Sequence, residues 1–316
     1  MANSKTGTLN MKDFTDVLLR EVNDYMDPEM TVRIVKISKP NMDPEQAMVF
    51  AAINMDETLS PAIYIRPLYD EYICGKSVHS LAAESIRTCR EQSSAFIFDI
   101  RSFTDLDQAI SKITCRVINY ESNRELLKQI PYREYLGLAL VLYYEIDDSR
   151  SILIRDIHID MWGTDMDNDS LFTIALSNTR RLYPAKIIPF TEVLDGLIGN
   201  VDSLSEDGDG PKGLNLFVLS NERLLYGAVN LLYDDVLAAA CRQTGSNKIY
   251  ILPSSVHEVI IIPADNKNGF KITDPHELKK IVQAINAKYV DQEDILGDYI
   301  YSFSISNSEK KLVIEA

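Results

Sequence analysis

The longest strongly apolar stretch of the sequence, LGLALVLYY, runs only from Leu136 to Tyr144. A helix that crosses a membrane needs about 20 apolar residues, so this stretch predicts a strand buried in a globular protein. The amino-terminal residues, MANSKTGTLNMKDFTDVLL, have no basic region followed by an apolar block and a cleavage site, as secretion signals have. We therefore expect a cytoplasmic protein with no membrane partner.

The charge of the chain argues against binding to nucleic acid. The 32 basic and 47 acidic side chains give a formal net charge of −15. Such a surface repels phosphate backbones, whereas a nucleic-acid-binding protein normally presents a basic face. Acidity of this size is typical of soluble bacterial proteins, and it indicates mimicry of a polyanion only weakly.

Neither the cysteines nor the histidines form a metal-binding pattern. Cys74, Cys89, Cys115 and Cys241 are widely separated and lack the paired spacing of a zinc site or a disulfide framework. The four histidines are also scattered along the chain. We expect reduced thiols, no metal and no cofactor.

The first half of the sequence predicts an α-β-β-β-α unit followed by more antiparallel sheet. Periodicity and turn residues define its elements. The predicted helices are 11–26, 77–92 and 104–112, and the predicted strands are 31–39, 47–54, 62–68, 113–119, 133–147 and 149–156.

The second half predicts a mixed α/β region with a β-α-β unit and a β-hairpin. The polar, glycine-rich residues 200–213 predict a surface loop. The predicted helices are 170–182, 225–243 and 275–289, and the predicted strands are 214–220, 248–253, 257–263 and 298–306. The chain is therefore expected to be an α+β protein with domains at 10–160 and 161–316.

Two motifs resemble ligand-binding loops but are incomplete. The letters GKS, from Gly75 to Ser77, match the end of a phosphate-binding loop, but Asp70 stands where that loop requires a glycine. The letters DMDNDS, which end at Ser170, imitate half of a calcium loop, but Leu176 stands where the bidentate glutamate belongs. We interpret both as helix starts.

The segment YILPSSVHEVIIIP, residues 250–263, allows two interpretations. Serine hydroxyls that bond to the local backbone would make it the turn of a hairpin. Alternatively, His257 could act as a base for Ser255 and be oriented by Glu258. Neighbours on an extended chain point to opposite faces, and no elbow glycine or oxyanion loop is visible. The hairpin is therefore the favoured interpretation.

Four segments together resemble a bacterial family found mainly in clostridia, the domain of unknown function numbered five-six-eight-eight. They are LSPAIYIRPLYDEYICGKSV, RVINYESNRELLKQIPYREYLGLALVLYYEI, LSNTRRLYP and IYILPSSVHEVIIIP. The resemblance covers roughly residues 10–301 and implies no reaction. The residues that match the motif are Asn178, Thr179, Pro253, Ser254, Ser255, His257 and Glu258.

Three hypotheses for function follow. The leading one is a non-enzymatic protein-binding or accessory factor with an unidentified protein partner. The alternative is a hydrolase-like enzyme that uses the region of Ser254, Ser255, His257 and Glu258. It requires these side chains to converge in a deep pocket beside another carboxylate or Asn178. The third is an acidic mimic of nucleic acid, which requires clustered carboxylates.

Overall fold

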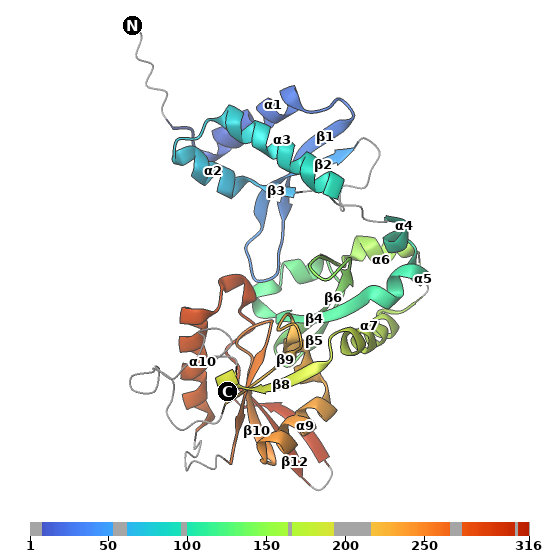
Figure 1. Ribbon diagram of the computed structural model, residues 1–316, viewed down its shortest axis with the longest axis vertical. Coiled ribbons are helices and arrows are strands. Elements are labelled where there is room, and N and C mark those ends of the chain that lie inside the picture. Colours follow the sequence, from blue (N-terminus) through green and yellow to red (C-terminus); the bar gives the residue numbers. More distant parts are fainter. Residues whose placement is uncertain are drawn as a thin grey trace. The chain divides into compact units, whose positions relative to one another are not determined.

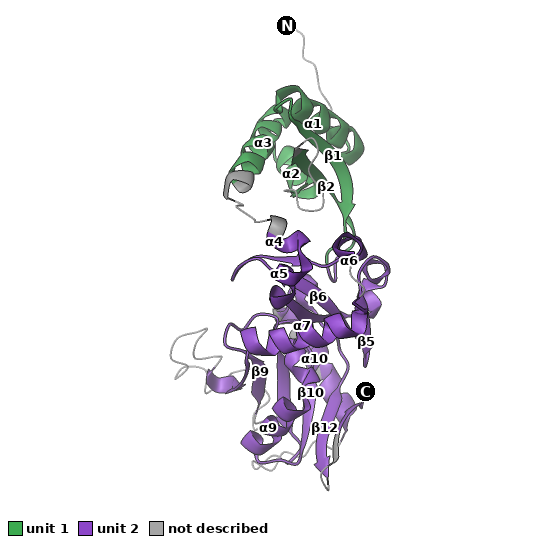
Figure 2. Ribbon diagram, turned by 90° about the vertical axis from the view of Figure 1, so that its right-hand side faces the viewer, with its two compact units in different colours: residues 1–39, 43–99 green, residues 40–42, 100–316 purple. Residues whose placement is uncertain are grey.

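The computed structural model describes residues 8–52, 62–95, 100–163, 166–192, 216–265, 274–306 and 309–315. Its described residues form helices and three antiparallel sheets, which confirms the predicted α+β class. Contacts divide the chain into two compact units (Figure 2), residues 1–39 with 43–99 and residues 40–42 with 100–316. The domain boundary predicted between residues 160 and 161 lies within the second unit, in helix α6 (Asp156–Trp162), and stays a prediction.

The first unit packs helices on a three-stranded sheet in the order β1-β2-β3. Its helices lie beside the sheet (Figure 1). Phe14 and Leu18 of the first helix, Phe50 of the second strand and Leu81 of the third helix share its core. This order confirms the predicted α-β-β-β-α arrangement. The elements are α1 (Met11–Tyr25), β1 (Met30–Ile37), β2 (Glu45–Ala52), β3 (Ala62–Tyr64), α2 (Ile65–Ile73) and α3 (Val78–Ala95).

Helix α2 corrects part of the strand predicted at 62–68, because only the first residues of that segment pair in the sheet. Pro67 lies in the first turn of α2, where its missing N–H would have no helical acceptor. The proline that was predicted inside a strand therefore lies in the first turn of a helix.

The GKS motif connects α2 to α3 and is held by neighbouring side chains. Gly75 has a φ of 103°, and the Ser77 hydroxyl accepts a bond from the Ser80 amide at 3.1 Å. The Lys76 ammonium lies 2.7 Å from Glu71 and 2.5 Å from Glu84. These hydrogen bonds raise the pKa of Lys76. The lysine is thus bound to carboxylates of the same unit, consistent with the structural interpretation.

The second unit contains a four-stranded sheet centred on β6. Strand β6 pairs antiparallel with β4, β5 and β7. Gly137 has a φ of 80° and splits the strand predicted at 133–147 into β5 and β6. Helix α7 (Asn168–Leu182) packs on β4, and its first turn is capped by Asp167. The strands are β4 (Ile113–Asn119), β5 (Tyr132–Tyr135), β6 (Leu138–Glu145) and β7 (Ser151–Leu153).

The second unit also contains a six-stranded antiparallel sheet in the order β13-β12-β10-β11-β9-β8. Strands β9 and β10 run parallel, but β11 lies between them and pairs with both. The two strands of the predicted β-α-β unit are therefore not direct neighbours in the sheet. Residues of β10 and β11 pack against helix α10 (Pro275–Tyr289), while helix α9 (Asp234–Thr244) covers the other face (Figure 1). The strands are β8 (Ala185–Pro189), β9 (Phe217–Asn221), β10 (Lys248–Leu252), β11 (Val259–Pro263), β12 (Tyr301–Ser306) and β13 (Glu309–Ile314).

The helix predicted at 225–243 is shorter than expected. A 3-10 helix, η6 (Gly227–Leu232), comes first, and Tyr233 with extended backbone angles separates it from α9. Strands β8 and β13 were not predicted. The loop predicted at 200–213 lies outside the described residues. Within the described part of the chain, no helix is long and apolar enough to cross a bilayer.

Candidate binding site

The segment around His257 joins two strands of one hairpin. Strands β10 and β11 pair antiparallel, with Leu252 opposite Ile260, so the predicted chain reversal is present. Ser254 and Ser255 are only 2% and 3% exposed. The Ser255 hydroxyl accepts a hydrogen bond from the His257 amide at 3.0 Å, as the turn interpretation predicts.

The His257 ring connects the hairpin to two other segments. Its Nδ1 accepts a hydrogen bond from the Tyr226 amide at 3.2 Å, and its Nε2 lies 3.2 Å from Asp294. The His257 carbonyl accepts from the Gly227 amide at 2.8 Å and from the Ser220 hydroxyl at 2.7 Å. Both ring nitrogens are therefore engaged by groups other than the hairpin serines.

Glu258 is the other titratable group of the hairpin. Burial raises its pKa above the ordinary value, while the charge of His257 and a hydrogen bond with Ser255 act in the opposite direction. The carboxylate is thus held next to Ser255 in an environment that disfavours its charge. This is a property of the turn and needs no substrate.

Asn178 and Thr179 hold helix α7 against β4. The Asn178 amide donates to the carbonyls of Ile110 and Ile113 at 2.7 and 3.0 Å. The Thr179 hydroxyl accepts from the Cys115 amide at 2.7 Å. The Asn178 side-chain oxygen accepts from Arg181 of the same helix at 3.4 Å. Within the described residues, none of the hydrogen bonds of Asn178 thus reaches the hairpin.

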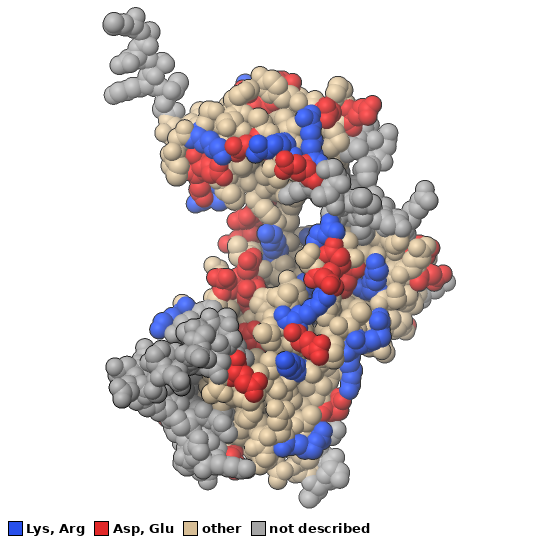
Figure 3. Space-filling model, viewed as in Figure 1, with Lys and Arg blue, Asp and Glu red and all other residues tan. Residues whose placement is uncertain are grey.

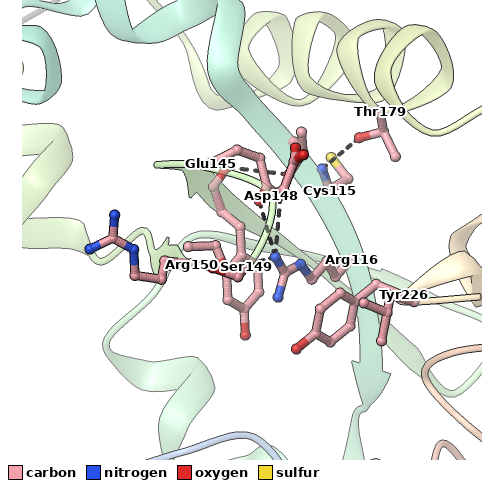
Figure 4. A network of polar contacts seen from close by, with 12 residues as sticks. Cys115, Arg116, Glu145, Asp148, Ser149, Arg150, Thr179 and Tyr226 are labelled. Carbon is pink, nitrogen blue, oxygen red and sulfur yellow. Dashed lines mark hydrogen bonds and ion pairs between the residues drawn. The ribbon is translucent and has the colours of Figure 1, made fainter. Parts of the chain in front are cut away.

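A pocket of about 110 Å³ lies elsewhere in the second unit, between segments that are far apart in the sequence. It is bounded by β4, the turn between β6 and β7, the end of α7 and the loop after β9 (Figure 4). Its lining residues are Thr114, Cys115, Arg116, Glu145, Asp148, Ser149, Arg150, Ser151, Thr179, Tyr183, Arg223, Leu225 and Tyr226.

Arg116 forms the innermost charged group of this pocket. Its guanidinium lies 3.2 Å from a Glu145 oxygen, and the two side chains are 10% and 11% exposed. It also donates to the Ser151 hydroxyl at 2.7 Å. The rings of Tyr143 and Tyr226 lie 3.9 and 3.6 Å from the guanidinium carbon, so they can hold it by cation-π contacts. The charge is therefore paired, and its orientation is fixed.

The pKa of Tyr143 reflects the burial of its hydroxyl beside Arg116. Loss of water around its hydroxyl raises the pKa of Tyr143 to about 12, although the charge of Arg116 lowers it. The pKa of the neighbouring Tyr183 is also raised, first by burial and then by the charge of Glu145. Both phenols are therefore neutral hydrogen-bonding groups at neutral pH.

The rim of the pocket carries two more arginines. Arg223 forms an ion pair with Asp148, and its guanidinium lies 5.2 Å from the ring centre of Tyr183. Arg150 bonds to Asp147 instead, which holds the pKa of that carboxyl well below its usual range. Figure 4 shows the Arg150 side chain extending away from Arg116. Arg116 and Arg223 are thus the basic groups that can act at the pocket.

The loop between β9 and η6 carries exposed apolar side chains, of which Leu225 and Tyr226 line the pocket. Leu224, Leu225 and Tyr226 are 44%, 46% and 38% exposed. Leu224 and Tyr226 both have a φ of 55°, a left-handed backbone that is unfavourable for such residues. The Asn221 amide bonds to the Leu225 carbonyl at 2.7 Å, and His257 bonds to Tyr226. The predicted histidine thus supports a loop whose tyrosine covers Arg116.

The residues of this pocket were not found by the sequence analysis. Their segments are separated by tens of residues, so no spacing rule connects them. One signal was present, because Arg116 and Glu145 stand in two otherwise apolar strand segments, ITCRVIN and LALVLYYE. A charge in a buried strand requires a partner of opposite sign, and these two are that pair.

The size and chemistry of the pocket limit what it can hold. A cavity for a drug-sized ligand or cofactor is usually about 300 Å³ or larger, so this one suits a single small group. Among the described residues, no cluster of histidine, cysteine, aspartate or glutamate could hold a metal ion. The pocket can therefore bind a group that hydrogen-bonds to arginine.

Comparison with known proteins gives one match. Searches of the curated proteins and of the solved structures found none. The model of a family of unknown function, DUF5688, matches residues 11–305. Since this match spans nearly the whole chain, the protein belongs to the DUF5688 family.

Proposed function

We propose that this chain is a non-enzymatic protein-binding factor whose second unit binds a partner through residues 224–226 and the Arg116 pocket. One observation carries the proposal. Leu224, Leu225 and Tyr226 are exposed on a loop with two left-handed residues, directly beside a pocket lined by arginines. Strained, exposed apolar residues next to a polar recess are typical of a binding surface.

The composition of this surface supports a protein as the ligand. Tyrosine and arginine are enriched at the energetically dominant positions of protein interfaces, where rings pack and guanidinium groups bond. Tyr226 and Arg116 stack on each other, so both are already ordered before binding. Because less side-chain freedom is lost on association, preordered anchors favour tight binding.

The hydrolase hypothesis receives less support from the geometry of the hairpin. Asp294 is a carboxylate that could orient His257, as this hypothesis requires. A serine nucleophile also needs the second histidine nitrogen as its base, but Nδ1 accepts from the Tyr226 amide. Ser255 accepts a bond from the backbone instead. The mimic of nucleic acid is also less supported, because acidic and basic side chains alternate on the face shown in Figure 3.

A capture experiment with matched variants tests the proposal. The tagged full chain, an L224N variant and an L182N variant are used to capture proteins from an extract of the native cell. Asparagine tolerates the left-handed backbone at position 224, so L224N removes the apolar side chain without unfolding the loop. Leu182, at the end of α7, is 38% exposed and serves as the control.

We expect a stoichiometric partner with the unchanged chain and with L182N, and a clear loss with L224N. Cross-links between the partner and residues 221–227 should accompany capture. Recovery of the chain alone, or equal capture by L224N, would contradict the proposal.

A further inference from the structure

We propose that the pocket recognises an acidic side chain of the protein partner, and that Asp148 occupies the place of this carboxylate at Arg223 in the unbound protein. This inference rests on the proposed function and specifies the chemistry of its partner. The observation that supports it is a difference within the Arg223–Asp148 ion pair. The Arg223 side chain has other contacts and is partly buried, whereas the Asp148 side chain is almost fully exposed.

Arg223 is held by groups other than the Asp148 carboxylate, whereas within the described residues that carboxylate is paired with Arg223 alone. The Arg223 side chain is 34% exposed and lies against the Tyr183 ring, and its guanidinium donates to the backbone carbonyl of Asp148 at 3.3 Å. The Asp148 side chain is 92% exposed. An ion pair this open to water contributes little to stability, so another carboxylate can replace Asp148 at low cost.

The turn that carries Asp148 does not depend on its side chain. Asp147 accepts bonds from the amides of Ser149 and Arg150, both at 2.9 Å. Asp148 can therefore leave Arg223 while the turn keeps its shape. The pocket then exposes a fixed guanidinium that can form two parallel hydrogen bonds with a carboxylate.

The charge balance of the pocket favours a carboxylate over a phosphate. Glu145 forms an ion pair with Arg116, and both side chains are largely buried. It would repel the double charge of a phosphate more strongly than the single charge of a carboxylate. The volume of about 110 Å³ is roughly that of four water molecules, which is enough for a carboxylate and its bonded waters.

Nuclear magnetic resonance titration of the full chain tests this inference without knowledge of the partner. The probe is N-acetyl-glutamate amide, which carries a glutamate side chain, and N-acetyl-glutamine amide is its neutral control. N-acetyl-glycine presents a terminal carboxylate, and inorganic phosphate presents the other oxyanion. All titrations are performed at constant ionic strength, and the Arg223 side-chain N–H signal and the Ser149 and Arg150 amide signals are followed.

We expect saturable shifts in the millimolar range with N-acetyl-glutamate amide, and none with the glutamine analogue. D148N should bind the probe more tightly by up to about fivefold, the factor that corresponds to release of an exposed ion pair. R223Q should lose the response. R90Q, which removes an exposed arginine paired with Asp27 in the first unit, should behave like the unchanged chain.

Several outcomes would overturn the inference. These are an equal response to the glutamine analogue, tighter binding of phosphate or of N-acetyl-glycine, weaker binding by D148N, or an unchanged response in R223Q. If the carboxylate titration fails while L224N still loses the captured partner, the protein-binding function stands and only the acidic partner group is wrong. If the carboxylate titration succeeds while L224N captures as much partner as the unchanged chain, the pocket binds carboxylates but the proposed protein-binding surface is wrong.

Discussion

The hairpin at 253–258 and the Arg116 pocket both gather polar side chains, but they use them differently. In the hairpin, the Ser255 hydroxyl and the His257 ring bond to backbone groups that hold the chain in place. In the pocket, Arg116 and Arg223 are each paired with a carboxylate, Arg116 in the interior and Arg223 at the rim. The comparison teaches that polar residues close in sequence can serve the local backbone, whereas groups brought together from distant segments can face a ligand.

The largest effect should come from breaking the ion pair that the pocket depends on. R116A leaves Glu145 charged and largely buried without its partner, which should lower the free energy of unfolding by about 3–5 kcal/mol. Urea denaturation measures this loss. A double variant, R116M with E145Q, should recover most of it, because no unpaired charge remains. A loss below about 1 kcal/mol in R116A would mean that the pair is open to water.

The second-largest loss of stability is expected at Gly227, where the loop after β9 meets the hairpin. A methyl group added at Gly227 would lie 2.6 Å from the Ser220 Cα atom, so G227A must shift the backbone where the loop meets the hairpin. We expect a loss of about 1–3 kcal/mol in denaturation experiments. G163A is the control, because its position has a left-handed φ of 53° and open space around it. A loss in G227A no larger than that in G163A would show that the backbone around Ser220 gives way at little cost.

A smaller effect should show that the hairpin supports the pocket. H257A removes the acceptor of the Tyr226 amide and the partner of Asp294, which should cost about 1–2 kcal/mol. Hydrogen exchange should accelerate at the Tyr226 amide, whereas the exposed H276A variant should leave this exchange unchanged. If exchange at Tyr226 stays slow in H257A, the two regions are independent.

The smallest effect concerns the charge of Glu258. Because its folded pKa is raised, the stability that this group contributes is present below the ordinary pKa and is lost as pH rises through the raised value. E258Q remains neutral, so its melting temperature should exceed that of the unchanged chain at neutral pH by up to about 3 °C. The difference should disappear in acid. A pH-independent difference would place its cause in packing.

Much of the fold could be predicted because hydrophobic periodicity is a local property. Helix α1, strand β4 and helix α7 each follow from the spacing of their apolar residues. The predicted element boundaries are wrong where a single residue changes the backbone conformation. Gly137 divides β5 from β6, Pro67 lies in the first turn of a helix, and Tyr233 separates η6 from α9.

The candidate site could be predicted only in part, for a different physical reason. His257 and Ser255 were selected because they are adjacent in sequence, and the structure places His257 behind the binding loop. Arg116 and Arg223 lie on a strand and on a loop, and nothing in their local sequence indicates that both border one pocket. Such a site depends on tertiary packing, which periodicity does not encode.

The bond from Tyr226 to His257 also sets an order of events during synthesis. A ribosome has made every wall of the recess well before it reaches Asp294, which fixes the imidazole. Until that codon is translated, the imidazole lacks its carboxylate partner, and the backbone of the loop is held by its bonds to residues 221 and 257. A product truncated before Asp294 should therefore show faster hydrogen exchange at the Tyr226 amide than the full chain does.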